Sequence, residues 1–274
     1  MSSKNNLVTT DQMGRPIELA FPPKRIISLV PSISELLWDL GLKDELVGIT
    51  KFCIHPKEMF KSKTRVGGTK NIHFDRIEAL KPDLIIGNKE ENTKEMIEEL
   101  ERTYPVWMTD VNTFEDSIKM MMQIGQICNR KEKAIEICTQ LKSLKDSFDQ
   151  TLSISKPSKV LYLIWKKPWM AVGKNTFIDE MLKIAGFKNA LADKERYPEL
   201  ASSDIKKLDA DLIFLSSEPY PFKDKHLEEA EALSNNSKAI LVDGEMFSWY
   251  GSRLLKSFAY FSNLRQQLTF LIHI

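Results

Sequence analysis

The stretch RIEALKPDLIIGNKEE, residues 76–91, has the pattern of a helix end, a turn and a buried strand. A closely similar stretch, DIKKLDADLIFLSSEP, occurs at residues 204–219. The two correspond at a constant offset of 128 residues, in the pairs Ile77 and Ile205, Leu80 and Leu208, and Asp83 and Asp211. The chain therefore carries the same helix-to-strand unit twice.

The segments before each copy are also alike. In the first half, the apolar run KRIISLV (24–30) predicts a strand, and PSISELLWDLGL (31–42) predicts a helix that ends at Gly41. Ser32 and Glu35 have the S-x-x-E spacing of a capping box at the start of that helix. The run ELVGIT (45–50) predicts the next strand.

The second half repeats this order. SKVLYLIW (158–165) predicts a buried strand, and NTFIDEMLKIAGF (175–187) predicts a helix that ends at Gly186. Thr176 and Asp179 repeat the cap spacing of the first half. Apolar strands that alternate with helices indicate parallel sheets covered on both faces. We therefore expect an α/β protein with two Rossmann-like lobes, and a single doubly wound sheet is the competing interpretation.

The segment between the halves favours two lobes. Residues 113–153 contain no proline and one glycine, and Thr113 and Asp116 are placed to cap their start. Asn129 is expected to divide the segment into two helices, the second about 23 residues and about 34 Å long. Its apolar stripe consists of Ala134, Cys138, Leu141, Leu144, Phe148 and Leu152. The expected domains are a lobe at 1–112, a rigid helical connector at 113–153 and a lobe at 154–274.

Composition excludes several classes of protein. The chain has 274 residues, a net charge of +1 and no basic stripe with interleaved aromatics, so a nucleic acid partner is not expected. No apolar run is long enough to span a membrane, and the polar start MSSKNNLVTTDQMGRP lacks the pattern of a signal peptide. The three cysteines, Cys53, Cys128 and Cys138, have no C-x-x-C spacing and are expected to be buried as small hydrophobic residues.

Ligands of open parallel α/β units bind beyond the carboxyl ends of the strands, so we expect the ligand in a cleft shared by the two lobes. Rigid aromatic rings with a few cationic groups suit a bulky, partly apolar and anionic organic ligand. The predicted ligand-binding residues lie in the turns that follow the strands. They are Pro31, Ser32, Lys51, Phe52, Thr69, Lys70, Asn88, Trp165, Lys167, Trp169, Tyr197, Tyr220, Trp249, Tyr250 and Arg253. Phe222 and Lys166 belong to the same turns. For Arg253, capping of carbonyl groups and pairing with an acid are open alternatives.

Motifs for catalysis are absent from the sequence. There is no G-x-S-x-G or G-x-G-x-x-G. The stretch VGKNT (172–176) is not a P-loop, because Pro168 stands where the first glycine should be and Asn175 stands where Ser or Thr should follow the lysine. The four histidines have no H-x-H or H-E-x-x-H spacing. His55 and His73, together with an acid, are the weak alternative for a metal site.

Five segments carry a resemblance to a known family: RIISLVPSISELLWDLGL (25–42), ELVGIT (45–50), FDRIEALKPDLIIG (74–87), AVGKNTFIDEMLKIAGFKNAL (171–191) and WYGSRLL (249–255). In this order they resemble the helical-backbone class of ABC-transporter substrate-binding proteins, which carry cobalamin, ferric siderophores and haem. The resemblance covers about nine-tenths of the chain. It implies two α/β lobes, one rigid connecting helix and a ligand held between the lobes with little closure.

The resemblance also implies a function and partners. The expected protein captures an iron–siderophore or a cobalamin-like chelate without chemistry, as a monomer that uses no cofactor and docks on an ABC permease. Asp75 matches the position of the family's permease-docking acid in the first lobe. Its counterpart at the 128-residue offset is Ser203, and the adjacent Asp204 is the candidate docking acid of the second lobe. Thr69 and Asn88 stand where the best-known cobalamin binder has tryptophans, which leaves the ligand open. The family implies a periplasmic or cell-envelope location, and the cytoplasm is the alternative. A metal-ion receptor of the same fold and an enzyme on a two-lobed scaffold are the alternative functions.

Overall fold

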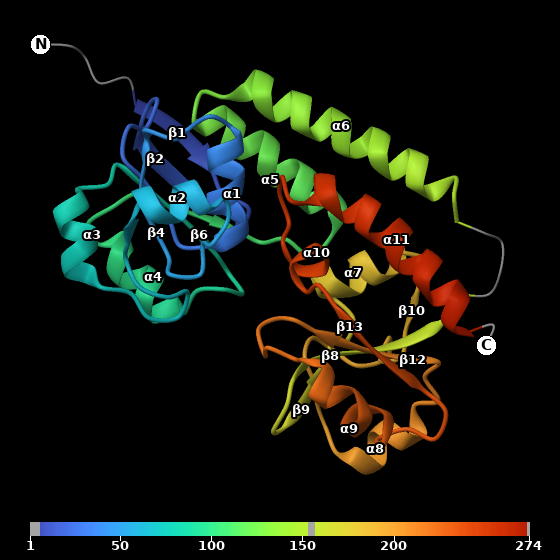
Figure 1. The fold of residues 1–274 in the computed structure, drawn as a ribbon. Helices are drawn as coiled ribbons and strands as arrows, with labels where there is room; N and C mark the ends of the chain where they lie inside the picture. The colour runs from blue at the N-terminus through green and yellow to red at the C-terminus, as the bar shows by residue number, and fades with distance from the viewer. Residues whose placement is uncertain (1–5, 153–156, 273–274) are drawn as a thin grey trace, which may run out of the picture. The chain divides into compact units, whose positions relative to one another are not determined.

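The computed structural model describes residues 6–152 and 157–272, and they form two α/β lobes (Figure 1). The first lobe consists of the chain up to Val111, Glu115–Leu141 and Tyr250–Arg253. The second consists of Asn112–Phe114, Lys142–Trp249 and the chain from Leu254 onward. Two separate sheets confirm the expected fold class over one doubly wound sheet. The domain bounds and the shared cleft stay predictions, and the bound at residue 153 lies outside the described residues.

In the first lobe, the sheet is parallel throughout its described strands. Their order is β5-β4-β3-β6-β7, and the register places Ile26 of β3 beside Leu46 of β4 and Leu84 of β6. A two-stranded antiparallel hairpin precedes this sheet and was not predicted from the sequence. The strands are β1 (Asn6–Thr10), β2 (Pro16–Ala20), β3 (Ile26–Ser28), β4 (Leu46–Ile49), β5 (Thr64–Arg65), β6 (Leu84–Asn88) and β7 (Val106–Thr109). The helices are α1 (Pro31–Asp39), α2 (Lys57–Ser62), α3 (Phe74–Leu80) and α4 (Lys94–Glu101).

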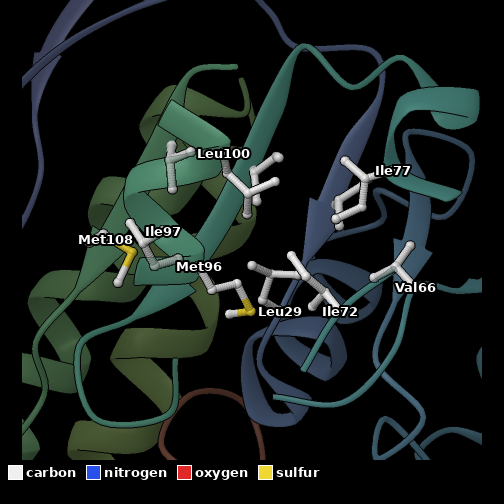
Figure 2. Packing of buried hydrophobic residues seen from close by; sticks show 11 residues of the cluster. Leu29, Val66, Ile72, Ile77, Met96, Ile97, Leu100 and Met108 are labelled. Carbon is white, nitrogen blue, oxygen red and sulfur yellow. The ribbon is translucent and has the colours of Figure 1, made fainter. Parts of the chain in front are cut away.

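One face of this sheet packs against α3 and α4. Ile77 of α3 and Leu100 of α4 belong to one buried cluster with strand residues, and Figure 2 shows Met108 beside Ile97 and Leu29 beside Met96. The alternate strand residues Ile26, Ile86 and Trp107 are completely buried as well. Since side chains alternate between faces along a strand, both faces of the sheet are covered, as a parallel sheet requires.

The second lobe has a mixed sheet in the order β11-β9-β8-β12-β13, with β10 also paired to β8. Strands β8, β10, β12 and β13 run parallel, whereas β9 pairs antiparallel with β8 and β11. The expectation of a purely parallel sheet is therefore wrong here, because Trp165 and Trp169 are joined by a tight turn that reverses the chain. The strands are β8 (Lys159–Trp165), β9 (Trp169–Ala171), β10 (Lys188–Asn189), β11 (Glu199–Leu200), β12 (Leu212–Ser216) and β13 (Lys238–Val242). The helices are α7 (Phe177–Ile184), α8 (Ser202–Lys207), η1 (Asp224–His226), α9 (Leu227–Glu231), α10 (Glu245–Ser248) and α11 (Leu254–Ile272).

The two faces of this sheet have different cores. Leu161 and Ile213 belong to a cluster with residues of α8 and α9, which lie on one side of the sheet in Figure 1. On the other face, Tyr162 and Phe214 meet an aromatic group that includes Phe247, with a distance of 5.3 Å between the Tyr162 and Phe247 ring centroids. The alternation of Leu161 and Tyr162 thus assigns each face its own packing partners.

The repeated stretch folds the same way in both lobes. Helix α3 leads into β6, and helix α8 leads into β12. Between helix and strand, Lys81 and Asp209 occupy equivalent positions and both have positive φ, at 45° and 48°. A left-handed residue ends each helix and turns the chain into its strand.

The aspartates of the repeat hold the start of β3 in the first lobe and of β8 in the second. Asp83 accepts hydrogen bonds from the backbone amides of Lys24 and Arg25, both at 2.8 Å. Asp211 accepts one from the Lys159 amide at 2.6 Å. The Arg25 guanidinium and the Lys159 ammonium also donate to the carbonyls of Leu80 and Leu208 in turn. The duplication therefore includes the hydrogen bonds as well as the order of elements.

Of the two caps predicted for the repeated helices α1 and α7, only that of α7 forms as expected. Thr176 is the N-cap of α7, where its hydroxyl accepts from the Asp179 amide at 3.2 Å. In α1 the N-cap is Val30, with Pro31 in the first turn and no side-chain cap bond. The predicted capping box of Ser32 and Glu35 is therefore wrong, because the N-cap lies two residues before Ser32 and Pro31 suits the first helical position.

Two helices follow β7, α5 (Phe114–Ile127) and α6 (Lys131–Asp149), and Asn129 separates them with a φ of 54°. Helix α6 has 19 residues rather than the predicted 23, about 28 Å at 1.5 Å per residue. Its stripe is buried at Ala134, Cys138, Leu141 and Phe148. The first lobe holds α6 residues up to Leu141, and the second holds the rest. Within the described chain, no helix has the length and apolarity to cross a membrane.

Candidate functional site

In the second lobe, an aromatic cluster forms where the strands end. We use this name for Trp165, Trp169, Tyr220, Phe222 and the neighbouring His226. Trp165 is the last residue of β8, Trp169 begins β9, and Tyr220 and Phe222 follow β12. The amide of Tyr220 donates to the Ile164 carbonyl at 3.3 Å, which holds the segment after β12 against the end of β8.

The rings of the aromatic cluster form a continuous chain of contacts. Trp165 meets Tyr220 edge-on at 5.5 Å between centroids, and Tyr220 lies 4.6 Å from Phe222. Trp169 is parallel to Phe222, with 1° between the ring planes and 6.2 Å between the centroids. Trp165 remains 39% exposed, whereas Phe222 is buried. The cluster is thus a packed base of rings with one indole open to a ligand.

Two lysines border the aromatic cluster and differ in their pairing. Lys166 forms an ion pair with Glu229 and lies 5.8 Å from the Trp169 ring centroid. Lys167 is exposed in the turn between β8 and β9, with a φ of 64°. Among the described residues no acid pairs with Lys167, so its charge is available to a ligand.

Trp249 is placed by a carboxylate. Its indole Nε1 donates to Glu218 Oε1 at 2.9 Å, and its side chain is 6% exposed. The hydroxyl of Ser248 donates to the same oxygen at 2.6 Å. Sequence reasoning selected Trp249 but missed Glu218, although the acid directly precedes Pro219 in the turn after a predicted strand.

Tyr197 lies beside β9 rather than within the aromatic cluster. The carbonyls of its neighbours Arg196 and Pro198 accept from the amides of Gly173 and Ala171. The Arg196 guanidinium lies 5.7 Å from the Tyr197 ring centroid. Tyr197 is half-buried and stays a predicted ligand contact.

In the first lobe, Asn92 joins the turns that follow three strands. Its side-chain amide donates to the carbonyls of Leu29 at 3.3 Å and Thr69 at 2.9 Å. Its side-chain oxygen accepts from the Asn88 amide at 2.8 Å. A Cβ on Gly87 would lie 2.8 Å from that oxygen, so the close approach requires glycine there. The predicted residues Thr69 and Asn88 are therefore brought together by a residue that sequence reasoning missed.

Asn88 is occupied by its own loop. Its side-chain oxygen accepts from the amides of Glu90 and Glu91, and its NH₂ group donates to Thr109 Oγ1 at 2.9 Å. Lys70 donates to the Glu90 carbonyl. Asn88 therefore shapes the turn after β6 and is itself buried.

Lys51 and Phe52 form the exposed part of this edge. The Lys51 amide donates to the Gly67 carbonyl at 2.7 Å, which joins the turns after β4 and β5. Lys51 Nζ lies 5.0 Å from the Phe52 ring centroid, and Phe52 is 49% exposed. No described acid forms an ion pair with Lys51, so this pair offers a ligand an open ring and a cation.

Tyr250 belongs to a buried polar group of the first lobe. Burial raises the pKa of its hydroxyl, and the nearby Glu91 carboxylate raises it further. Burial also raises the pKa of the Glu91 carboxyl, and Lys70 opposes that rise. Ser32 and Tyr250, both predicted ligand residues, are thus enclosed by protein.

Arg253 takes the alternative of pairing with an acid. Its Nε and Nη2 donate to the two carboxylate oxygens of Glu35, at 2.7 and 2.9 Å. Both side chains are 5% exposed. The structure therefore corrects the role of Glu35, which is an ion-pair partner and not a helix cap. Pro31, next to Ser32 at the start of α1, is half-buried.

The remaining predicted residues lie on surfaces. His55 is half-buried and His73 is exposed, and no group of three or more His, Cys, Asp or Glu side chains in the described chain is arranged to hold a metal ion. Asp75 and Asp204 are exposed in the first turns of α3 and α8. Asp204 pairs with Lys207 at 3.1 Å, whereas the described residues show no partner for Asp75.

Comparisons with known proteins agree with the geometry. Residues 26–240 match the family model described as periplasmic binding protein. YvrC of Bacillus subtilis, an uncharacterized ABC transporter substrate-binding lipoprotein, is 28% identical over 259 residues, covering 90% of this chain and 81% of the relative.

Two solved structures share the fold. A possible iron-binding (periplasmic solute-binding) protein from Staphylococcus epidermidis has a TM-score of 0.75 and 22% identity, covering 90% of this chain and 99% of that one. The periplasmic vitamin B12 binding protein BtuF of Vibrio cholerae has a TM-score of 0.73 and 19% identity, covering 88% of this chain and 95% of that one. Together with the family match, they confirm the resemblance drawn from the sequence motifs.

Proposed function

The chain belongs to the periplasmic binding protein family, and from this premise we propose that it captures an iron chelate or a corrinoid and releases it unchanged. The observation that carries the proposal is the aromatic cluster of the second lobe, whose rings are packed on one another while Trp165 stays 39% exposed. The proteins of similar fold from Staphylococcus epidermidis and Vibrio cholerae are described as iron-binding and vitamin B12 binding, which supports this ligand class.

Capture in this proposal depends on stacking and on charge. Aromatic contacts contribute about 0.5–1.5 kcal/mol each beyond the burial of area, and the rings are held by their neighbours before the ligand arrives. Lys167, next to the aromatic cluster, offsets negative charge on the ligand. Arg253 does not contribute, because the Glu35 carboxylate already neutralises it.

The chemistry of the ligand is left unchanged in this proposal. The aromatic cluster supplies rings and indole N–H groups, and the bordering lysines supply ammonium groups. These groups bind without forming or breaking bonds. The lipoprotein nature of the Bacillus relative supports a place in the cell envelope, with an ABC permease as the partner.

Tryptophan fluorescence tests the proposal. The purified protein is titrated with cyanocobalamin, haemin, and ferric catecholate and hydroxamate siderophores. We expect saturable quenching by one of them, and about a tenfold loss of affinity in both Trp165→Leu and Trp169→Leu. Trp38→Phe, which changes an indole of α1 outside the aromatic cluster, is the matched control and should keep the affinity. Binding that is unaffected by either cluster variant would remove the cluster from the site.

A further inference from the structure

We propose that Glu218 is a positioning residue for ligand capture, which fixes the Trp249 indole and ties it to the segment that carries Tyr220 and Phe222. The inference rests on the proposed function, because it assigns Trp249 to the same binding wall. Glu218 is two residues before Tyr220 and 31 residues before Trp249.

Hydrogen bonds fix the backbone at Glu218 to the end of β12. Ser216, at the end of β12, donates its hydroxyl to the Glu218 carbonyl at 2.6 Å. The Tyr162 hydroxyl in turn donates to Ser216 Oγ at 3.2 Å, and Tyr162 is completely buried. The turn that carries Glu218 is therefore connected to the buried centre of the sheet.

The turns after β12 and β13 are then held together. The Gly244 amide donates to Ser217 Oγ at 2.9 Å, and the Ser217 amide donates to the Val242 carbonyl at 3.0 Å. A Cβ on Gly244 would lie 2.8 Å from Glu218 Cγ and closer still to Ser216 Oγ. Only glycine permits this approach, which brings the Glu218 side chain to the start of α10.

The carboxylate completes the connection. Glu218 Oε1 accepts from Trp249 Nε1 at 2.9 Å and from Ser248 Oγ at 2.6 Å. A hydrogen bond to a charged acceptor is stronger than one between neutral groups, and two donors on one oxygen restrict its orientation. The indole ring therefore has one preferred orientation, set by a residue from a different turn.

The test reads the Trp249 ring directly. In protein labelled with 5-fluorotryptophan, Trp249→Phe assigns the Trp249 ¹⁹F resonance. We expect Glu218→Ala to shift and broaden that resonance while the other tryptophan resonances keep their positions. Glu218→Gln keeps an acceptor oxygen and should restore a narrow resonance. Ser248→Ala, which removes only the other donor, is the matched control and should leave the resonance narrow.

Ligand affinity then tests whether the orientation of the Trp249 ring matters for capture. For the probe that binds among cyanocobalamin, haemin and the ferric siderophores, Glu218→Ala should weaken binding about tenfold. Glu218→Gln should stay within about threefold of the unchanged protein. In the Trp249→Phe background, Glu218→Ala should have less than about a twofold effect, because the ring it positions is gone.

Two results would overturn the inference. One is an unchanged Trp249 resonance in folded Glu218→Ala, and the other is a full loss of affinity from Glu218→Ala in the Trp249→Phe background. Failure of the proposed function looks different. In that case no probe binds, while the spectrum of the protein without ligand still decides whether Glu218 holds the ring. If Glu218→Ala does not fold, Glu218→Met, which keeps the length of the side chain and removes the acceptor oxygen, provides the same readout, and an unmoved Trp249 resonance there counts against the inference.

Discussion

At the scale of single residues, the pair of Glu35 and Arg253 has the largest expected effect on stability. The two side chains are both 5% exposed and make two hydrogen bonds. Removal of one member takes away both hydrogen bonds and leaves the other charge buried without them, which costs about 3–5 kcal/mol. Replacement of both by apolar residues removes both desolvation penalties and costs much less.

We therefore predict that Arg253→Met lowers the free energy of unfolding by about 3–5 kcal/mol, and that Glu35→Leu added to it recovers most of the loss. Urea unfolding followed by fluorescence measures both. The control is Lys145→Ala, which breaks a partly exposed pair with Asp149 and should cost less than about 1 kcal/mol. If Arg253→Met keeps its stability but binds the ligand more weakly, this prediction is wrong and Arg253 is a ligand-binding residue.

The cysteines allow a second prediction at this scale. Cys53, Cys128 and Cys138 are free and buried, as the sequence predicted. Burial disfavours the thiolate, so it raises the pKa of Cys53 and of Cys128. The reactive thiolate is therefore scarcer at pH 8 in the folded protein than in an unfolded chain. We expect a disulfide reagent to label the folded protein at less than about one hundredth of the rate in urea. Rapid labelling of one thiol before unfolding would contradict this.

At the scale of elements, the duplicated helix-to-strand unit makes a paired prediction. Asp83 and Asp211 each accept backbone hydrogen bonds from the strand beside them. We expect Asp83→Ala and Asp211→Ala each to lower stability by about 1–2 kcal/mol, since hydrogen bonds to charged groups are stronger than average. Because the two residues lie in different lobes and share no partner, the losses should add in the double variant.

Thermal and urea unfolding of the single and double variants measure this. Asp211→Asn is the matched control, because it keeps an acceptor oxygen for the Lys159 amide and should lose less than Asp211→Ala. A neutral effect at one aspartate and a large one at the other would show that the two copies no longer use the same stabilising contact.

Local patterns predicted the elements well where the controlling contacts are near in sequence. Thr176 caps α7 three residues before Asp179, and Gly186 ends the same helix with a φ of 80°. The same reasoning failed at Ser32 because Pro31 takes the first helical position, which places the N-cap two residues before Ser32. The antiparallel strands β9 and β11 were missed because they have only three and two residues, too few for a periodic pattern.

The candidate site was less predictable, since its contacts join distant positions. Glu35 and Arg253 are 218 residues apart, and Glu218 and Trp249 come from separate turns. The sequence indicated which strand ends carry aromatic and polar residues. It could not indicate which of these side chains already form hydrogen bonds within the protein, as Asn88 does with Thr109 and with the backbone of its own loop. Exposure of Trp165 and Phe52, against burial of Trp249 and Tyr250, follows from tertiary packing alone.

At the scale of the whole molecule, each lobe presents an exposed acid in the first turn of its repeated helix. Asp75 lies in the first turn of α3 and Asp204 in the first turn of α8, and α3 and α8 are the helices of the repeat. Both side chains are exposed, and the pair of Asp204 with Lys207 is of the exposed kind that contributes little to stability. If the protein delivers its ligand to an ABC permease, charge at these positions will act on docking rather than on folding or capture.

We therefore predict that Asp75→Lys and Asp204→Lys each reduce uptake of the ligand at least about tenfold when the protein works with its permease in proteoliposomes. Ligand affinity and the melting temperature should stay unchanged, because neither side chain belongs to a core or to the aromatic cluster. Glu58→Lys reverses an exposed acid in the first turn of α2 and serves as the matched control. The difference in uptake between the unchanged protein and the variants should diminish as salt rises toward 1 M, since salt screens exposed charges. Normal uptake by both variants would exclude these acids from docking, and a loss in Asp75→Lys alone would assign docking to the first lobe, where the described residues leave Asp75 without a partner.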